Sequence, residues 1–420
     1  RAFRCQRNCR EFESHRPLHN QGVNGQMDRP GFCILPFTTL YVQENQVKLC
    51  CESEEHTQHL ISEQTPISDI WNNEFYTKTR SDMIAGKLPE YCRICRLNEE
   101  AGEESKRQWD NSKAKNLFDY NDTYVNSPIK YDMRPSNKCN LECVMCDGLV
   151  STAINDRVQK YIKDTGTDDF VIATGHNWKD NRLIIDYVKQ NSVNINEMKF
   201  CGGEPFLVAE VLEMLDHLVT TGDCENIDLS FITNGTVVRS KWFSEKLTQF
   251  KSVKLNISID GVGEVGEYVR YPSKWSVVDN NIQLFKTIIK NNPQIKMSLA
   301  PVIHLLNALH MDEVIEYAAV NDINIALSPV YQASNELYLS TELLTAELRQ
   351  TAHDKMFAMI EQYPDISFNL GRGFIKNLPQ QEYMTDKKVI QQLNQVVRYW
   401  DSHRQIKFLQ QYPYLEYLVK

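Results

Sequence analysis

Three cysteines stand close together between residues 134 and 148, in the order C-x3-C-x2-C. They are Cys139, Cys143 and Cys146. Thiolates at such short spacing are typical ligands of iron–sulfur clusters and of zinc. Both kinds of site usually take four protein ligands, so a loop with three thiolates either lacks its fourth ligand or leaves one position open. The stretch therefore predicts a metal centre, and its spacing alone leaves both alternatives open.

A second group of cysteines precedes the first. Its members are Cys33, Cys50, Cys51, Cys92 and Cys95, and the last two form a C-x2-C pair. The chain has 12 cysteines and no secretory signal, so the clustering favours metal ligands in a reducing compartment over disulfides. We therefore expect a cytoplasmic protein. Cys201 and Cys224 stand apart and are expected to be buried apolar side chains.

Composition narrows the range of partners. The 420 residues suit one large α/β domain with an accessory piece. The formal net charge of -9 provides no dominant basic field, so nucleic-acid binding is not expected. The sequence contains no apolar run of about 18 residues. Neither a membrane-spanning helix nor a membrane partner is therefore expected.

The elements that must position the cysteine triad follow from hydrophobic periodicity. Six short apolar runs alternate with helical patterns between residues 128 and 335. Strands alternating with helices imply parallel βαβ units, here an α/β fold with a partial (β/α)6 TIM-like barrel. In such folds the chemistry lies at the carboxyl ends of the strands, where Glu204, Asn234 and Asp260 fall. Residues 336–420 have helical patterns and are expected to cover an edge of the sheet.

The segment before the barrel has a different character. Residues 28–127 are mixed and cysteine-rich, and they predict a small domain that a bound metal would help to stabilise. The alternating pattern of residues 31–51 predicts a hairpin with Asn45 at the turn. One or two short helices should follow and end at Gly86 and Pro89.

The first 26 residues are polar and lack a starting Met. We expect residues 1–26 to be a non-native or disordered leader, with Met27 as the native start.

The cysteine triad and three strand-end sequences together resemble the radical S-adenosylmethionine (SAM) superfamily. The strand-end sequences are CGGEP, ITNG and SIDG, which begin at Cys201, Ile232 and Ser258. The resemblance implies that the triad holds a [4Fe–4S] cluster whose fourth iron binds SAM. It implies that the reduced cluster cleaves SAM to a 5′-deoxyadenosyl radical, which abstracts a substrate hydrogen atom. It also implies SAM-orienting roles for Gly202, Gly203, Glu204, Thr233, Asn234, Ser258, Asp260 and Arg270.

The first cysteine group resembles the auxiliary-cluster segment of twitch and SPASM domains, which generally follows the barrel but here precedes it. Asn45 stands where glycine is usual, and asparagine also tolerates left-handed backbone geometry. The resemblance implies an auxiliary [4Fe–4S] cluster on Cys33, Cys50, Cys92 and Cys95. Cys51 is the alternative to Cys50, and a structural zinc site with four cysteine ligands is the competing interpretation.

These features predict a radical SAM enzyme whose auxiliary cluster accepts an electron from the product radical or binds substrate. We expect a peptide or protein side chain as substrate, by analogy. The alternative is a dehydrogenase or epimerase of a sugar or nucleotide-like molecule. The non-enzymatic alternative is an iron–sulfur electron carrier or a degenerate binding module. An external electron donor such as flavodoxin or ferredoxin is an expected partner. Four further side chains either face the cavity or are structural: His304, His310, Tyr331 and Arg372.

Overall fold

The fold is given by a computed structural model, which describes residues 30–419 apart from 56–58, 101–103, 114–121, 168–169, 176–181, 330–336, 365–367 and 370. The expectations for residues 1–26, for Met27 and for Tyr331 lie outside the described residues.

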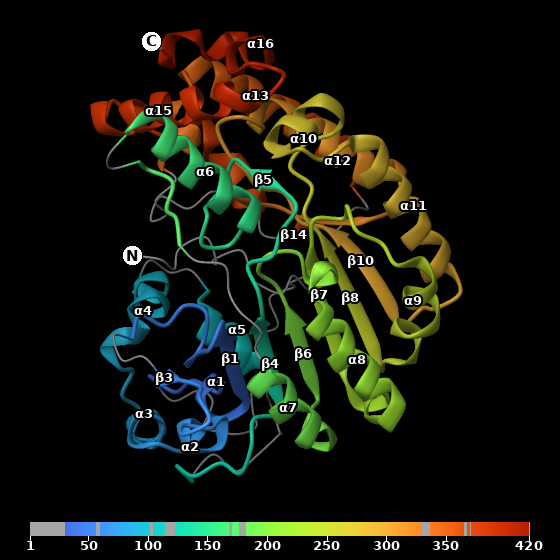
Figure 1. The fold of residues 1–420 in the computed structure, drawn as a ribbon. Helices are drawn as coiled ribbons and strands as arrows, with labels where there is room; N and C mark the ends of the chain where they lie inside the picture. The colour runs from blue at the N-terminus through green and yellow to red at the C-terminus, as the bar shows by residue number, and fades with distance from the viewer. Residues whose placement is uncertain are drawn as a thin grey trace.

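A ten-stranded sheet forms the centre of the molecule (Figure 1), in the order β14-β12-β10-β8-β7-β6-β4-β1-β2-β3. Neighbours from β14 to β1 are parallel, and β2 and β3 are antiparallel. The strands are β1 Thr39–Gln43, β2 Gln46–Lys48, β3 His59–Leu60, β4 Lys130–Arg134, β6 Glu197–Phe200, β7 Asp228–Thr233, β8 Ser252–Ile257, β10 Ile295–Leu299, β12 Asn324–Ala326 and β14 Phe368–Asn369. All six predicted barrel strands are present, which confirms the α/β fold with a partial TIM-like barrel.

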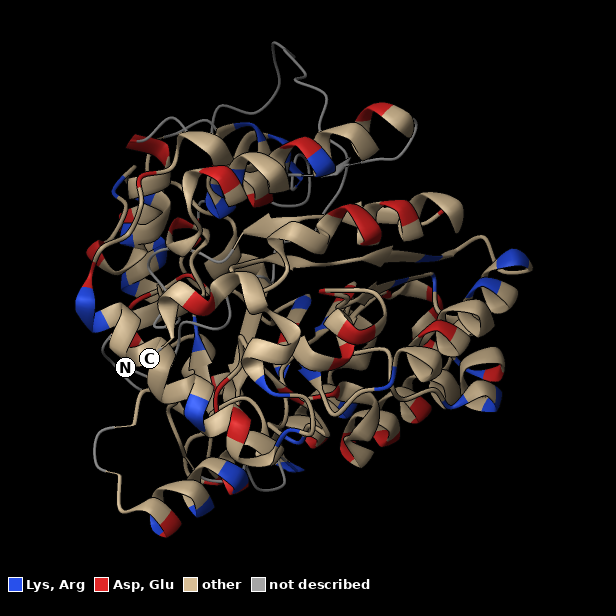
Figure 2. Cartoon of the chain, turned by 90° about the horizontal axis from the view of Figure 1, so that it is seen from above, with Lys and Arg blue, Asp and Glu red and all other residues tan. Residues whose placement is uncertain are grey.

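Residues alternate between the two faces of the barrel strands. In β8, Val253, Leu255 and Ile257 are buried, whereas Lys254 and Asn256 are half-buried. Figure 1 shows helices along the outer side of these strands. They are α7 Arg182–Gln190, α8 Ala209–Thr221, α9 Ser240–Glu245, α11 Trp275–Lys290 and α12 Met311–Val320. Basic and acidic residues are interspersed along the helices of the molecule (Figure 2). Burial of the apolar sides against the strands is therefore the main force that holds these helices in place.

Most of the elements predicted for the segment before the barrel are present in the structure. The hairpin β1–β2 turns at Glu44 and Asn45, but the left-handed residue is Glu44, with φ of 54°. The predicted hairpin with Asn45 at the turn is therefore confirmed, and the left-handed position of the two-residue turn falls one residue earlier, at Glu44. The helices are α1 Leu35–Thr38, α2 Ile67–Trp71, α3 Glu74–Ile84, α4 Arg93–Glu100 and α5 Lys106–Lys113.

The segment also joins the barrel sheet, because β1 pairs in parallel with β4 from Thr39–Lys130 to Gln43–Arg134. The sheet thus continues across the predicted boundary near residue 127. The division into domains stays a prediction.

The part of the chain after the barrel is mainly helical, as predicted. Its helices are α13 Ala346–Gln362, α14 Gly371–Asn377, α15 Lys387–His403 and α16 Phe408–Gln411. The strand β14 was not predicted, and it adds an edge strand beside β12. Within the parts of the chain that the structure describes, none of the helices is both long and apolar enough to cross a membrane.

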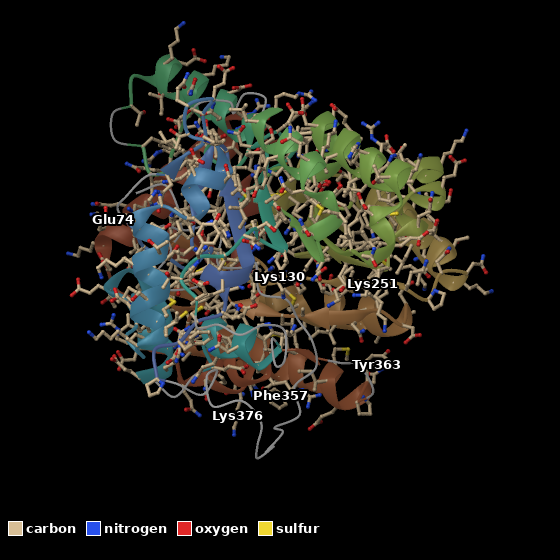
Figure 3. All side chains as sticks on the ribbon, turned by 90° about the horizontal axis from the view of Figure 1, so that it is seen from below. Glu74, Lys130, Lys251, Phe357, Tyr363 and Lys376 are labelled. Atoms are coloured by element: carbon tan, nitrogen blue, oxygen red, sulfur yellow. The ribbon has the colours of Figure 1, made fainter. Side chains whose placement is uncertain are left out.

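Short elements complete the carboxyl-terminal side of the barrel. They are α6 Thr152–Thr165, α10 Gly263–Val269, the strand pair β5 Glu142–Cys143 and β9 Arg270–Tyr271, and the strand pair β11 Val302–Ile303 and β13 Ser328–Pro329. Figure 3 views the molecule from below and labels Lys130 and Lys251, at the amino ends of β4 and β8. The residues that follow the strands therefore lie at the opposite end of the sheet.

Candidate functional site

The cysteine triad lies on the loop that follows β4, and its three thiols are free of disulfides. The pairing of β5 with β9 places Cys143 opposite Arg270. A hydrogen bond with Cys146, together with burial, raises the pKa of the Cys143 thiol well above its usual value. Burial, with a smaller contribution from Cys143, raises the pKa of Cys139 to about 12. The thiols thus interact with one another, as ligands of one cluster would, and a bound cation would favour their thiolate forms.

Two glycines fit the CGGEP loop against the cysteine loop. Gly202 and Gly203 have φ angles of 82° and 56°. A Cβ at Gly203 would lie 2.4 Å from the carbonyl oxygen of Lys138, so only glycine permits this approach. The amide of Glu204 donates to the same carbonyl at 2.8 Å. The loop after β6 is therefore fixed to the residue that precedes Cys139.

The carboxylate of Glu204 is fully buried and joins two strand ends. It accepts hydrogen bonds from the Asn234 amide at 2.8 Å, the Thr233 hydroxyl at 2.9 Å and the Phe206 amide at 3.2 Å. Burial raises its pKa to about 7, and these hydrogen bonds oppose the rise. Glu204 and Thr233 thus bind each other and fix the end of β6 to the end of β7.

Asn234 connects β7 to the cysteine loop. Its Nδ2 donates to Asn140 Oδ1 at 3.0 Å and lies 3.9 Å from the Sγ of Cys139. Asn140 in turn donates to the hydroxyl of Thr236 at 2.9 Å. Sequence reasoning missed Asn140, because an asparagine between two predicted ligand cysteines belongs to no motif of its own.

Asp260 and Arg270 form a buried ion pair beside the triad. Arg270 Nη2 lies 2.6 Å from Asp260 Oδ2, and Arg270 Nη1 donates to the Sγ of Cys143 at 3.8 Å. The amide of Val302 donates to Asp260 Oδ1 at 2.7 Å. Burial raises the pKa of the Asp260 carboxyl, and Arg270 opposes the rise. The guanidinium is placed to stabilise negative charge on Cys143.

Two buried donors next to this ion pair have no hydrogen-bond acceptor among the described residues. They are Arg270 Nε and His304 Nε2. His304 Nδ1 accepts from the Leu306 amide at 3.1 Å, so Nε2 carries the ring proton. Burial, and then Arg270, lower the pKa of His304 to about 3, which keeps the ring neutral. Buried donors without acceptors are rare in folded proteins. The residues present therefore fit a ligand with acceptor groups, such as the carboxylate of SAM.

The remaining predicted side chains are placed as follows. Ser258 is half-buried at the end of β8, and its amide donates to the Thr233 carbonyl at 2.9 Å. His310 contacts Glu313 at 3.1 Å, and Arg372 is exposed on α14. Cys201 and Cys224 are buried, as predicted.

The four predicted auxiliary cysteines lie in one region of the amino-terminal segment. Cys33, Cys50 and Cys92 pack with an apolar cluster made of Phe32, Ile34, Leu35, Phe37 and Met83. Burial raises the pKa of Cys50 well above its usual value, and Cys51, Cys95, Cys33 and Cys92 raise it further. Cys51 is half-buried, and after burial it has the largest effect on the pKa of Cys50. Over residues that the structure describes, no three His, Cys, Asp or Glu side chains converge on a single-ion site. The thiols thus gather without forming a preformed chelate.

Comparison with known proteins gives a family match over part of the chain. Residues 133–318 match the family described as the radical SAM superfamily. This range, which is less than half of the chain, holds the cysteine triad and all three strand-end motifs. Members of that superfamily are enzymes. No curated protein matches the chain.

Among solved structures, the chain is similar to native anSMEcpe with bound AdoMet, with 19% identity and a TM-score of 0.43. The match covers 61% of this chain and 68% of that one. It is also similar to Streptococcus suis SuiB bound to S-adenosylmethionine, with 15% identity and a TM-score of 0.39. That match covers 70% of this chain and 61% of that one.

Proposed function

We propose that the protein is a radical SAM enzyme in which Cys139, Cys143 and Cys146 hold a [4Fe–4S] cluster with one iron open to SAM. The observation that carries the proposal is the group of three interacting thiols inside the matched range. When bound, the cluster and SAM would supply reductive cleavage of the sulfonium and a radical that abstracts hydrogen from the substrate.

The chain's own residues would bind and orient these groups. Arg270 lies against Cys143 and Asp260, so it can balance thiolate charge and bind a ligand carboxylate. Glu204, Thr233 and Asn234 bind one another, so their part is to hold the strand ends in register. Gly202 and Gly203 bring the loop backbone close to the triad, and Ser258 stands beside it at the end of β8.

The proposal is tested with anaerobically reconstituted protein, SAM and dithionite, by measuring 5′-deoxyadenosine. Wild-type protein should form it, with any obligatory substrate supplied. The variant Cys143→Ala should not. The matched control is Cys224→Ala, a buried cysteine outside both groups, which should retain activity. An iron-loaded wild-type protein that forms no 5′-deoxyadenosine would support the electron-carrier or binding-module alternative.

We further propose that Cys33, Cys50, Cys92 and Cys95 hold an auxiliary [4Fe–4S] cluster. Their gathering in one region supports this, and Cys51, which acts on the pKa of Cys50, stays the alternative ligand. A cluster with four thiolate ligands has no open iron, which favours electron transfer over substrate binding.

Metal analysis separates the alternatives for this second site. Wild-type protein should carry about eight irons per chain, whereas a zinc site would give about four irons and one zinc. Cys50→Ala should lose about half of the iron, and Cys51→Ala should keep it. The reverse pattern would assign Cys51 instead.

For the substrate we propose a peptide or protein side chain, with a sugar or nucleotide-like molecule as the alternative. A reducing cytoplasm and an external electron donor such as flavodoxin or ferredoxin complete the proposal. Turnover with a donor protein in place of dithionite tests the last part.

A further inference from the structure

The end of helix α15 reaches the cysteine loop from far along the chain. Figure 1 shows α15 beside α6 and β5, and the rings of Tyr161 and Tyr399 lie 5.2 Å apart between the two helices. The residues at this end, His403 and Arg404, lie outside the matched range 133–318. The radical SAM domain alone therefore does not account for them.

Arg404 binds the backbone on both sides of the triad's strand pair. Its Nη2 donates to the carbonyl of Glu142 at 2.9 Å, and its Nη1 donates to the carbonyl of Tyr268 at 2.7 Å. Glu142 immediately precedes Cys143, and Tyr268 lies two residues before Arg270. One guanidinium thus links the chain at the cluster ligand to the chain at its cationic partner.

Arg404 is itself held rigidly. It is 2% exposed, and its guanidinium carbon lies 4.8 Å from the ring centre of Tyr268 and 5.1 Å from that of Trp400. A buried planar cation between aromatic rings has few alternative positions. Its two hydrogen bonds therefore fix the distance between Glu142 in β5 and Tyr268 at the end of α10.

The side chain of Glu142 adds further contacts between the cysteine loop and the helices α6 and α15. Glu142 accepts from Arg157 Nε at 2.8 Å, and its other carboxylate oxygen lies 3.1 Å from His403 Nε2. The carboxylate next to Cys143 is thus bound to both α15 and α6.

We infer that Arg404 is a positioning residue of the cluster site: it holds Cys143 opposite Arg270 by binding the carbonyls of Glu142 and Tyr268. This inference rests on the proposed function. The C-terminal helices then set the geometry of the cluster loop, instead of only covering the sheet. Lysine in place of arginine cannot donate to both carbonyls with a rigid fork, so it restores the function only in part.

The test compares Arg404→Met and Arg404→Lys with two controls in the full chain. Arg398→Gln changes an exposed arginine on the same helix. Asn394→Ala removes a buried bond from α15 to the Leu418 carbonyl, so it weakens the C-terminal helices without touching the cysteine loop.

The first readout is hydrogen exchange of the cofactor-free protein. The Val144 amide donates to the Val269 carbonyl at 2.9 Å, directly beside the linked strands. In Arg404→Met the Val144 amide should exchange its hydrogen about tenfold faster or more than in wild type, because the charge-assisted hydrogen bonds to the two buried carbonyls are lost. Arg404→Lys should be intermediate, and both controls should match wild type here.

The second readout is the spectrum and the KM for SAM of the reconstituted protein. Arg404→Met should alter the electron paramagnetic resonance spectrum of the reduced cluster with SAM and raise the KM for SAM several-fold more than Asn394→Ala does. The inference would be overturned if the Val144 amide of Arg404→Met exchanged at the wild-type rate. It would also be overturned if Asn394→Ala changed the exchange rate or the KM for SAM as much as Arg404→Met does. A wild-type protein that assembles no [4Fe–4S] cluster would count against the proposed function instead, and the exchange measurement would still decide the role of Arg404.

Discussion

Gly203 and Gly263 have nearly the same backbone conformation, with φ angles of 56° and 58°, but only Gly203 is crowded. A Cβ at Gly203 would lie 2.4 Å from the Lys138 carbonyl, whereas nothing lies within 4 Å at Gly263. Gly263→Ala should therefore cost only the left-handed backbone penalty of about 1–2 kcal/mol. Gly203→Ala should cost more and lower the iron bound after reconstitution. Urea unfolding and iron analysis test this, and equal losses in the two variants would contradict it.

The residue Glu204 allows a second comparison at this scale. The Phe206 amide, the Thr233 hydroxyl and the Asn234 amide all donate hydrogen bonds to the Glu204 carboxylate. In Glu204→Gln the side-chain NH2 group is also a donor, so it would face donors where an acceptor is needed. We expect the free energy of unfolding to fall by about 1–3 kcal/mol. Glu210→Gln, at a half-buried glutamate on the adjoining helix α8, serves as the control and should stay within about 0.5 kcal/mol of wild type. Equal stability of the two variants would mean that Glu204 does not join the strand ends.

At the scale of elements, helix α6 fixes the cysteine loop through its first turn. The Ser151 hydroxyl accepts from the Ile154 amide at 3.4 Å and donates to the Leu141 carbonyl at 2.7 Å. Thr345 caps α13 in the same way, with a bond from the Leu348 amide at 3.3 Å, but lies outside the matched domain. Ser151→Ala and Thr345→Ala should each cost about 1 kcal/mol of unfolding free energy. Only Ser151→Ala should also lower the iron content after reconstitution. The same iron content in both variants would show that the first turn of α6 does not fix the cysteine loop.

The elements also show what periodicity can predict. The barrel strands have apolar runs with clear ends, so their order and the positions of Glu204, Asn234 and Asp260 follow from the sequence. The strand β14 has only two residues, Phe368 and Asn369, and so has no period to detect. The contact of Arg404 with Glu142 joins residues 262 positions apart, and nothing in a local pattern specifies such a pair.

At the scale of the whole molecule, the sheet links the amino-terminal segment to the barrel. Backbone bonds extend this seam beyond the β1–β4 pairing, from Glu44 to the Arg134 carbonyl at 3.1 Å and from Ile129 to the Thr38 carbonyl at 3.0 Å. A small cysteine-rich segment gains most of its stability by such pairing and by burial against the larger core. The two parts should therefore unfold as one cooperative unit, even without bound metal.

Arg80 tests that cooperativity, because it is fully buried in the amino-terminal segment and far in sequence from the barrel strands. Its guanidinium donates to the carbonyls of Pro36, Trp71 and Thr123 at 2.8–3.0 Å. Arg80→Met leaves these acceptors unpaired, so the free energy of unfolding should fall by about 3 kcal/mol or more.

Native-state hydrogen exchange then shows how far the loss extends. If the molecule is one unit, the slowest amides of β7 and β8 should lose the same free energy as those of β1. Lys78→Met, on the exposed side of the same helix α3, should change neither. Unchanged protection of β7 and β8 in Arg80→Met, with early opening of β1 alone, would show instead that residues 28–127 form a separate domain, as the cysteine pattern of the sequence predicts.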